Sequence, residues 1–162
     1  MLLSAYAGAM SAEGQKLYPG EAAGPCEVLA LAHEYRRAAD ALLPTGRRGS
    51  PLSRAPYRLI AIHAIELYLN AYLLAAGHSP AEVRRLQHDF GSRTQRAVDT
   101  RLVLKQRTLT HLKKLSERRE YLTTRYDCAP TETSELNRLG ASLAEVAEKG
   151  SAIVGAPRAG ST

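Results

Sequence analysis

The sequence predicts an all-α fold, an up-and-down bundle of about five helices. Apolar residues recur at steps of three and four along most of the chain, and no segment shows the period-two alternation of β-strands. Single prolines and glycines separate the helical stretches. The 162 residues suffice for one hydrophobic core. We therefore expect a flexible leader over residues 1–24, one helical domain over 25–149 and a disordered tail over 150–162.

The first two helices are predicted from Pro25 to just before Pro44 and from about Pro56 to Ala76. Between them, residues 44–56 contain three prolines, two glycines and three arginines, which is typical of a loop. The second helix is apolar on nearly all sides, as expected for the central helix of a bundle. Gly77 follows it as the expected left-handed C-terminal cap.

Three further helices are expected after Gly77. The sequence from Ser79 to Glu82 is a capping box with proline at the first helical position, which starts a helix running toward Phe90. A basic helical stretch from about Thr94 to Tyr126 follows, interrupted at most near residues 99–102. A last helix is predicted from Thr131 to Lys149. Their buried stripes are expected to consist of Leu102, Leu104, Leu109, Leu112, Leu115 and Leu122, and of Leu136, Leu139, Leu143 and Val146.

The positive charge is concentrated in the middle of the chain. The formal net charge is +6, and residues 79–126 alone contain 12 Lys and Arg against 5 Asp and Glu, a balance of +7 (12 − 5). Such a surface suits a polyanion, whether RNA, DNA or an acidic protein. A solvated basic face is the alternative interpretation.

Other function classes are disfavoured by what the chain lacks. Two cysteines without a CxxC pair, and no secretory signal, predict neither a disulfide framework nor a structural zinc site and favour the cytoplasm. The chain contains no run of eighteen apolar residues free of charge, so we expect no membrane span. HExxH, GxSxG and glycine-rich nucleotide loops are absent. We expect no metal and no cofactor.

Three polar residues stand on one face of the apolar second helix. His63, Glu66 and Asn70 follow one another at steps of three and four. One interpretation is a polar seam that bonds a neighbouring helix through His88 or Asp89. The other is a pocket lining in which Glu66 receives an arginine and Asn70 a phosphate or a base. Arg84 and Arg85, one turn before His88, are the candidate arginines for Glu66.

The same residues belong to a succession of motifs that resembles the HEPN domain family. The succession is HAIELYLNAYLLAAGHS, then LQHDF, then a basic helix ending REYLTTRYD. Its most specific elements are Ala64-Ile65-Glu66 with Ala71, the Gly77 break, His88-Asp89-Phe90 and Arg125-Tyr126. The resemblance covers about Pro25 to Lys149 and implies an all-α core that pairs as a homodimer.

Active members of this family are metal-independent ribonucleases that use an Arg and a His separated by four to six intervening residues. In this chain Arg118 and Arg119 are followed by residues 123–126, Thr-Thr-Arg-Tyr, none of which is a base at neutral pH. His111 follows Arg107 after only three intervening residues. The resemblance therefore implies a non-catalytic member that binds RNA or nucleotide, and we favour the absence of enzymatic activity.

The candidate polyanion contacts are Arg84, Arg85, Arg107, Arg118, Arg119, Arg125 and Tyr126. For the last two, an alternative is that Tyr126 packs under the final helix while Arg125 pairs with Glu120 or Glu66. The second candidate function is a protein-interaction module, antitoxin-like or a stress-response adaptor, whose basic face meets an acidic protein. The third is a divergent ribonuclease that uses His88 or His111.

Overall fold

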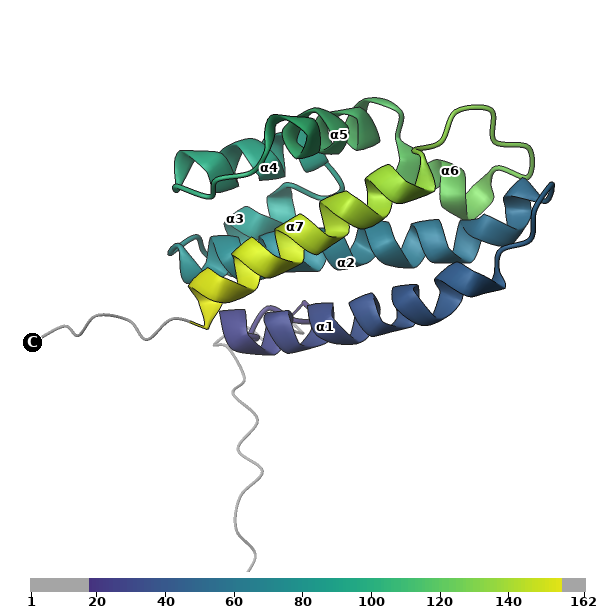
Figure 1. The fold of residues 1–162 in the computed structure, drawn as a ribbon. Helices are drawn as coiled ribbons and strands as arrows, with labels where there is room; N and C mark the ends of the chain where they lie inside the picture. Colours follow the sequence, from purple (N-terminus) through teal and green to yellow (C-terminus); the bar gives the residue numbers. More distant parts are fainter. Residues whose placement is uncertain (1–17, 156–162) are drawn as a thin grey trace, which may run out of the picture.

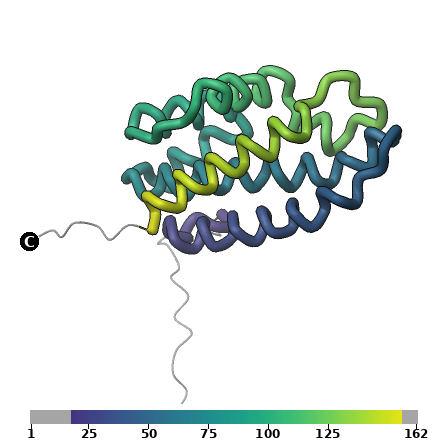
Figure 2. Tube along the Cα trace, viewed as in Figure 1, coloured from purple at the N-terminus to yellow at the C-terminus, as the bar shows by residue number. Residues whose placement is uncertain are grey.

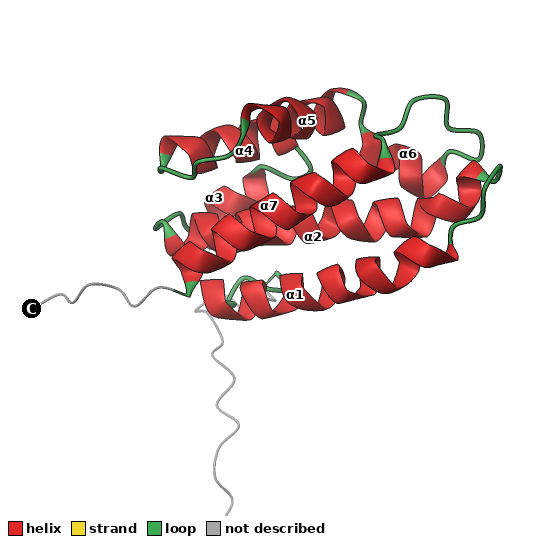
Figure 3. Cartoon of the chain, viewed as in Figure 1, coloured by secondary structure: helices red, strands yellow, loops and turns green. Residues whose placement is uncertain are grey.

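The structure is a computed structural model that describes residues 18–155, and this part of the chain contains helices and no strand (Figure 3). Seven α-helices and two short 3-10 helices follow one another as α1 (Pro25–Leu42), η1 (Leu43–Thr45), η2 (Pro51–Arg54), α2 (Ala55–Ala75), α3 (Pro80–Arg85), α4 (Phe90–Asp99), α5 (Gln106–Glu117), α6 (Glu120–Tyr126) and α7 (Leu136–Val154). The all-α prediction is confirmed. The helix number exceeds five because the basic stretch is divided into three.

Helix α2 forms the centre of the bundle. Helices α1, α4, α6 and α7 pack against it, and Figure 1 shows α7 crossing α2 while α1 runs along its other side. Eleven of its 21 residues are buried, on several sides of the helix. By length and composition alone the segment Pro51–Ala75, with a mean hydropathy of 1.2, could also cross a membrane. Its central position in the bundle accounts for the same apolar composition.

The ends of α1 and α2 agree with the sequence prediction. Each helix has proline in its first turn, where the missing N–H leaves no helical carbonyl unpaired. After α2, Gly77 adopts a φ of +101°, a left-handed conformation that L side chains adopt only with strain. The His78 N–H then donates to the Leu73 carbonyl at 3.0 Å, which closes the helix end. The predicted loop contains η1 and η2.

The helix predicted to run toward Phe90 ends at Arg85 instead. Gln87 turns the chain with a φ of +45°, and the Asp89 carboxylate then caps a new helix by accepting from the Ser92 N–H at 3.0 Å. The following basic stretch breaks twice, with Arg101 at φ +79° and Arg119 at φ +50°. The break at Arg101 lies within residues 99–102, where an interruption was expected, whereas the turns at Gln87 and Arg119 lie outside that interval.

The predicted outer boundaries of the domain also need correction. Helix α7 begins at Leu136 rather than Thr131 and continues to Val154, which is buried, so residues 150–154 belong to the fold and not to a disordered tail. Residues 18–24 of the predicted flexible leader form a turn, in which Glu21 reaches Arg84 on α3 at 3.3 Å. Residues 1–17 and 156–162 lie outside the described residues.

The expected leucine stripes supply much of the core. Leu102, Leu104, Leu112, Leu115, Leu139, Leu143 and Val146 are buried, while Leu109, Leu122 and Leu136 are partly buried. The tube in Figure 2 shows that α1 begins, and α7 ends, at the end of the bundle opposite to α6. The two cysteines, Cys26 at the start of α1 and Cys128 just after α6, are exposed and unpaired.

Candidate functional site

A largely buried carboxylate, Glu66, whose side chain is 12% exposed, organises the polar face of α2. Its Oε2 lies 3.2 Å from His88 Nδ1 and 3.8 Å from His63 Nδ1, and its Oε1 lies 3.5 Å from Arg93 Nη2. The predicted contact between the polar seam and His88 is confirmed. Its arginine partner is Arg93 of α4, so the expectation that Arg84 or Arg85 fills this role is wrong.

Arg93 is the functional-site residue that the sequence reasoning missed. Only 1% of the residue is exposed. Its Nε donates to Asn70 Oδ1 at 2.8 Å, and its Nη2 donates to the Gln87 carbonyl, so one guanidinium joins α2 to the turn before α4. A signal existed in the sequence: Phe90, Arg93 and Ala97 recur at steps of three and four, which puts the arginine on the buried face of its helix.

The charges of this cluster compensate one another. Burial alone would raise the pKa of Glu66, but His63, Arg93 and His88 outweigh it and hold that pKa below its ordinary value of 4.5. Burial lowers the pKa of Arg93, against the opposing charges of Glu66 and Asp89. An arginine stays protonated despite such a shift. The cluster is therefore a buried ion pair of Glu66 and Arg93, with two histidines beside the carboxylate.

Asp89 lies next to this cluster but bonds elsewhere. Its Oδ1 accepts from the Ser92 N–H at 3.0 Å and from Ser116 Oγ of α5 at 3.0 Å, while its Oδ2 accepts from Ser92 Oγ at 2.6 Å. The hydrogen bonds from Ser92 are the main cause of the lowered pKa of Asp89. The structure thus brings together four of the five predicted seam residues, and the fifth caps α4 and ties it to α5.

A hollow of about 430 Å³ opens beside this cluster, and we call it the His88 hollow. Its lining residues are Arg85, Leu86, Gln87, His88, Asp89, Ser92 and Tyr121. The His88 ring lies against the Tyr121 ring with centroids 4.1 Å apart. The left-handed Gln87 forms part of its rim, and non-glycine residues with such backbone strain cluster at functional sites.

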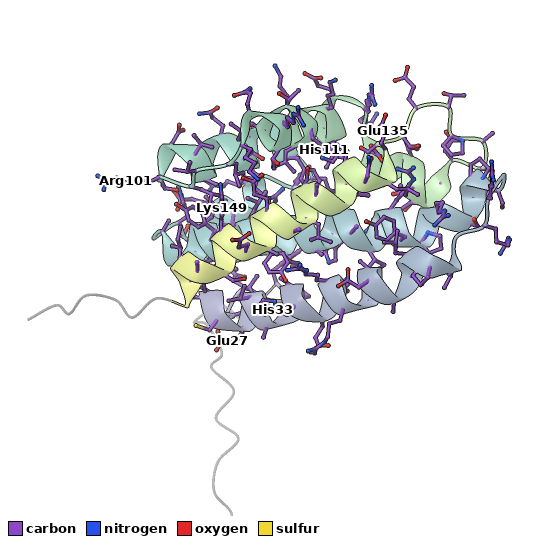
Figure 4. The ribbon with its side chains drawn as sticks, viewed as in Figure 1. Glu27, His33, Arg101, His111, Glu135 and Lys149 are labelled. Carbon is purple, nitrogen blue, oxygen red and sulfur yellow. The ribbon has the colours of Figure 1, made fainter. Side chains whose placement is uncertain are left out.

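His111 occupies a different environment, between α5 and α7 (Figure 4). Only 5% of it is exposed, and its Nδ1 and Nε2 lie 2.8 Å from Ser142 Oγ and 2.7 Å from Ser134 Oγ. Burial, followed by the charges of Arg138, Arg118 and Lys114, lowers its pKa from 6.5 to about 4. Both ring nitrogens are occupied and shielded from solvent, so His111 cannot reach an RNA substrate as a base.

Another carboxylate, Glu120, is the first residue of α6 and holds this end of the helix in place. Glu120 is fully buried and accepts hydrogen bonds from the Ser134 N–H and hydroxyl, with Arg58 Nη1 at 3.3 Å. The alternative pairing of Arg125 with Glu120 or Glu66 is therefore wrong. Tyr126 is 74% exposed, so it does not pack under the final helix either.

The seven predicted polyanion contacts do not converge on one cleft. Arg84 pairs with Glu21 and lies over the Tyr18 ring, whereas Arg85 lines the His88 hollow. Arg119 begins α6 in a left-handed conformation, and Arg125 is exposed near the end of that helix together with Tyr126. Arg107 lies on α5 and Arg118 directly follows its last residue, and both belong to a further group of cations.

That group consists of cations carried by the neighbouring helices α5 and α7, which we call the cation stripe: Arg107, Lys114, Arg118 and Arg138. The first three are exposed on one side of α5, at steps of seven and four. The charges of three of the four, Arg138, Arg118 and Lys114, lower the pKa of His111, so each of them lies within electrostatic range of that buried ring. Sequence reasoning did not select Lys114 and Arg138, because the helices that carry them, α5 and α7, come into contact only in the fold.

Within residues 18–155 no group of three or more His, Cys, Asp or Glu side chains is arranged to hold a metal ion. A second, small cavity of about 60 Å³ lies between η2 and α6, with Arg54, Arg58 and Asp127 among its lining residues. Comparison of the chain with protein-family models, with curated proteins and with solved structures finds no match.

Proposed function

We propose that this chain is a non-catalytic, HEPN-like helical protein that binds RNA or nucleotide through its basic face, working as a homodimer in the cytoplasm. The observation that carries the proposal is the cation stripe along α5 and α7. Of its members, only Arg118 has an acidic neighbour among the described residues, Glu132 at 3.7 Å, and that glutamate side chain is 73% exposed. Such exposed pairs contribute little and exchange easily for a phosphate.

A row of cations on a helix suits a phosphate backbone. The 12 residues of α5 span about 18 Å at about 1.5 Å per residue, a length along which several phosphates of a single strand can be contacted. Each phosphate neutralised by Lys or Arg releases condensed counterions, so affinity falls as salt rises. Arg119 and Arg125, exposed on the following helix, extend the positive surface beyond α5.

The same geometry supports binding without cleavage. Metal-independent RNA cleavage needs a base that takes the proton of a 2′-hydroxyl and a cation beside the scissile phosphate. The histidine nearest the cation stripe is His111, and it is enclosed by two serine hydroxyls. No histidine stands in the segment 119–127, where the resemblance places the catalytic one.

Fluorescence anisotropy with a labelled 20-nucleotide single-stranded RNA at several salt concentrations tests this proposal. Log affinity is expected to fall with log salt by about 0.7 per phosphate contacted, so the triple variant Arg107→Gln/Lys114→Gln/Arg118→Gln should lower the slope by about 2. The matched control is Arg37→Gln/Arg47→Gln/Arg48→Gln, which removes the same charge from exposed positions of α1 and its loop. Undetectable binding, or binding without a salt slope, would refute the proposal.

The second candidate is a protein-interaction module that meets an acidic partner, antitoxin-like or a stress-response adaptor. Two large side chains beside the basic residues favour it: Val103 and Tyr126 are each 74% exposed. Exposed aromatic and aliphatic side chains next to arginines are common at protein interfaces. Isolation of a stoichiometric complex with an acidic protein, free of nucleic acid and abolished by Val103→Ser/Tyr126→Ser, would favour this candidate over RNA binding.

A further inference from the structure

The His88 hollow combines groups that the cation stripe does not use. Arg85 supplies a cation at its rim, Tyr121 an aromatic face, and His88 a ring whose side chain is 37% exposed. Asp89 also lines the hollow, but Ser92 and Ser116 already donate to its carboxylate. An anionic group would therefore be held on the Arg85 side of the hollow.

The two nitrogens of His88 have different roles. Nδ1 lies 3.2 Å from Glu66 Oε2, and an ionised carboxylate can only accept, so the proton of the neutral ring resides on Nδ1. Nε2 is then an acceptor. It has no hydrogen-bond partner among residues 18–155 and is not one of the fully buried polar atoms, so it keeps exposed area on a side chain that lines the hollow.

An open acceptor beside a cation matches a hydroxyl donor next to a phosphate. We infer that the hollow seats one nucleotide of single-stranded RNA, with the ribose 2′-hydroxyl donating to His88 Nε2 and the 5′-phosphate of that nucleotide, which its 2′-hydroxyl cannot attack, lying on Arg85. The 2′-hydroxyl is the group by which a protein distinguishes RNA from DNA at a given site. This inference rests on the proposed function and adds to it the selection of ribose over deoxyribose.

The experiment compares three ten-nucleotide probes of one base: oligouridine, its 2′-deoxy form and its 2′-O-methyl form. The last two lack the hydroxyl donor. Wild-type protein should bind oligouridine about three- to tenfold more tightly than either, as expected for one net hydrogen bond. His88→Phe retains an aromatic ring against Tyr121 but has no Nε2. The ratio of its affinities for oligouridine and for the deoxy probe should therefore fall to about one, while its affinity for the deoxy probe is retained.

Two control variants separate this contact from general effects. His63→Phe changes a histidine that faces the same Glu66 carboxylate but does not line the hollow, so the ribose preference should persist. Arg85→Gln should lower the affinity for all three probes by the same factor and leave the ratios between these affinities unchanged. If His88→Phe does not fold, ¹⁵N NMR of the wild-type imidazoles provides the test: oligouridine should shift the His88 Nε2 signal and the deoxy probe should not.

The possible failures are distinguishable. Equal wild-type affinity for oligouridine and its deoxy form, with a salt slope for both, would overturn the ribose contact and leave polyanion binding intact. A ribose preference that survives His88→Phe would also overturn it. Failure of all three probes to bind would refute the proposed function itself.

Discussion

The Glu66 carboxylate of α2 faces the buried Arg93 guanidinium of α4 at 3.5 Å, and this ion pair joins the central helix to the helix that begins the basic stretch. The same guanidinium binds Asn70 and the Gln87 carbonyl, so its contacts also position the turn that carries His88. The polar face of α2 therefore both stabilises the bundle and determines the shape of the neighbouring hollow.

Replacement of Glu66 should mainly affect stability. Glu66→Ala leaves the Arg93 charge buried without its carboxylate, and breaking a buried pair in this way costs about 3–5 kcal/mol. Urea denaturation should show this loss, while RNA affinity measured well below the unfolding midpoint changes by less than tenfold. Glu34→Ala, which removes an exposed partner of Arg37, is the control and should cost less than about 1 kcal/mol. A larger effect on affinity than on stability would make Glu66 a binding residue.

The low pKa of His111 predicts a stability loss in mild acid. Its pKa is about 4 in the folded chain and about 6.5 when exposed, so the unfolded state binds more protons between these values. Stability should be fully present above pH 6.5 and fall as pH drops toward 4, by on the order of 3 kcal/mol from this group. Urea titrations from pH 4 to 7 measure it. His111→Asn should flatten this interval, and an unchanged pH profile in that variant would contradict the assignment.

Arg119→Gly should stabilise the protein. Arg119 adopts φ +50° and ψ +40°, a left-handed conformation that costs an L side chain roughly 1 kcal/mol and glycine very little. Thermal unfolding should therefore shift upward by a few degrees. Arg118 has an ordinary φ of −83°, so Arg118→Gly is the matched control and should not stabilise. A fall in Tm on Arg119→Gly would show that its side-chain contacts outweigh the strain.

Incubation with single-stranded RNA in EDTA should leave the RNA intact. His111 is shielded, the segment 119–127 holds no histidine, and in the proposed complex Arg85 holds the 5′-phosphate, not the phosphate that a 2′-hydroxyl at His88 would attack. Gel electrophoresis of a labelled oligonucleotide after long incubation checks this, with His88→Phe run in parallel. Cleavage that yields 2′,3′-cyclic ends and disappears in His88→Phe would refute the non-catalytic assignment and revive the divergent ribonuclease.

The sequence predicted those features that depend on local pattern. The ends of α1 and α2, the Gly77 cap and the capping box at Ser79 follow from nearby residues alone, and all are present. The breaks at Gln87 and Arg119 were missed because non-glycine residues there adopt left-handed conformations that no local signal marks.

Polar partners that are distant in sequence were the other feature that could not be predicted. The bonds of Glu66 to Arg93 and of Glu120 to Ser134 depend on how helices pack, and the prediction that Arg84 or Arg85, one turn before His88, pairs with Glu66 was wrong. The cation stripe combines residues of α5 and α7, two helices that come into contact only after folding. The contact of His88 with the α2 seam was foreseen because the polar residues on an apolar helix required a partner.

The two exposed thiols described above lie toward opposite ends of the bundle, one at the start of α1 and the other just after α6. They provide native attachment points for a donor and an acceptor dye. Energy transfer between the dyes would report separation of α6 from α1 during unfolding, and its change on adding RNA would show whether the bundle is rigid in the complex. This reporter leaves every residue of the cation stripe and the His88 hollow unaltered.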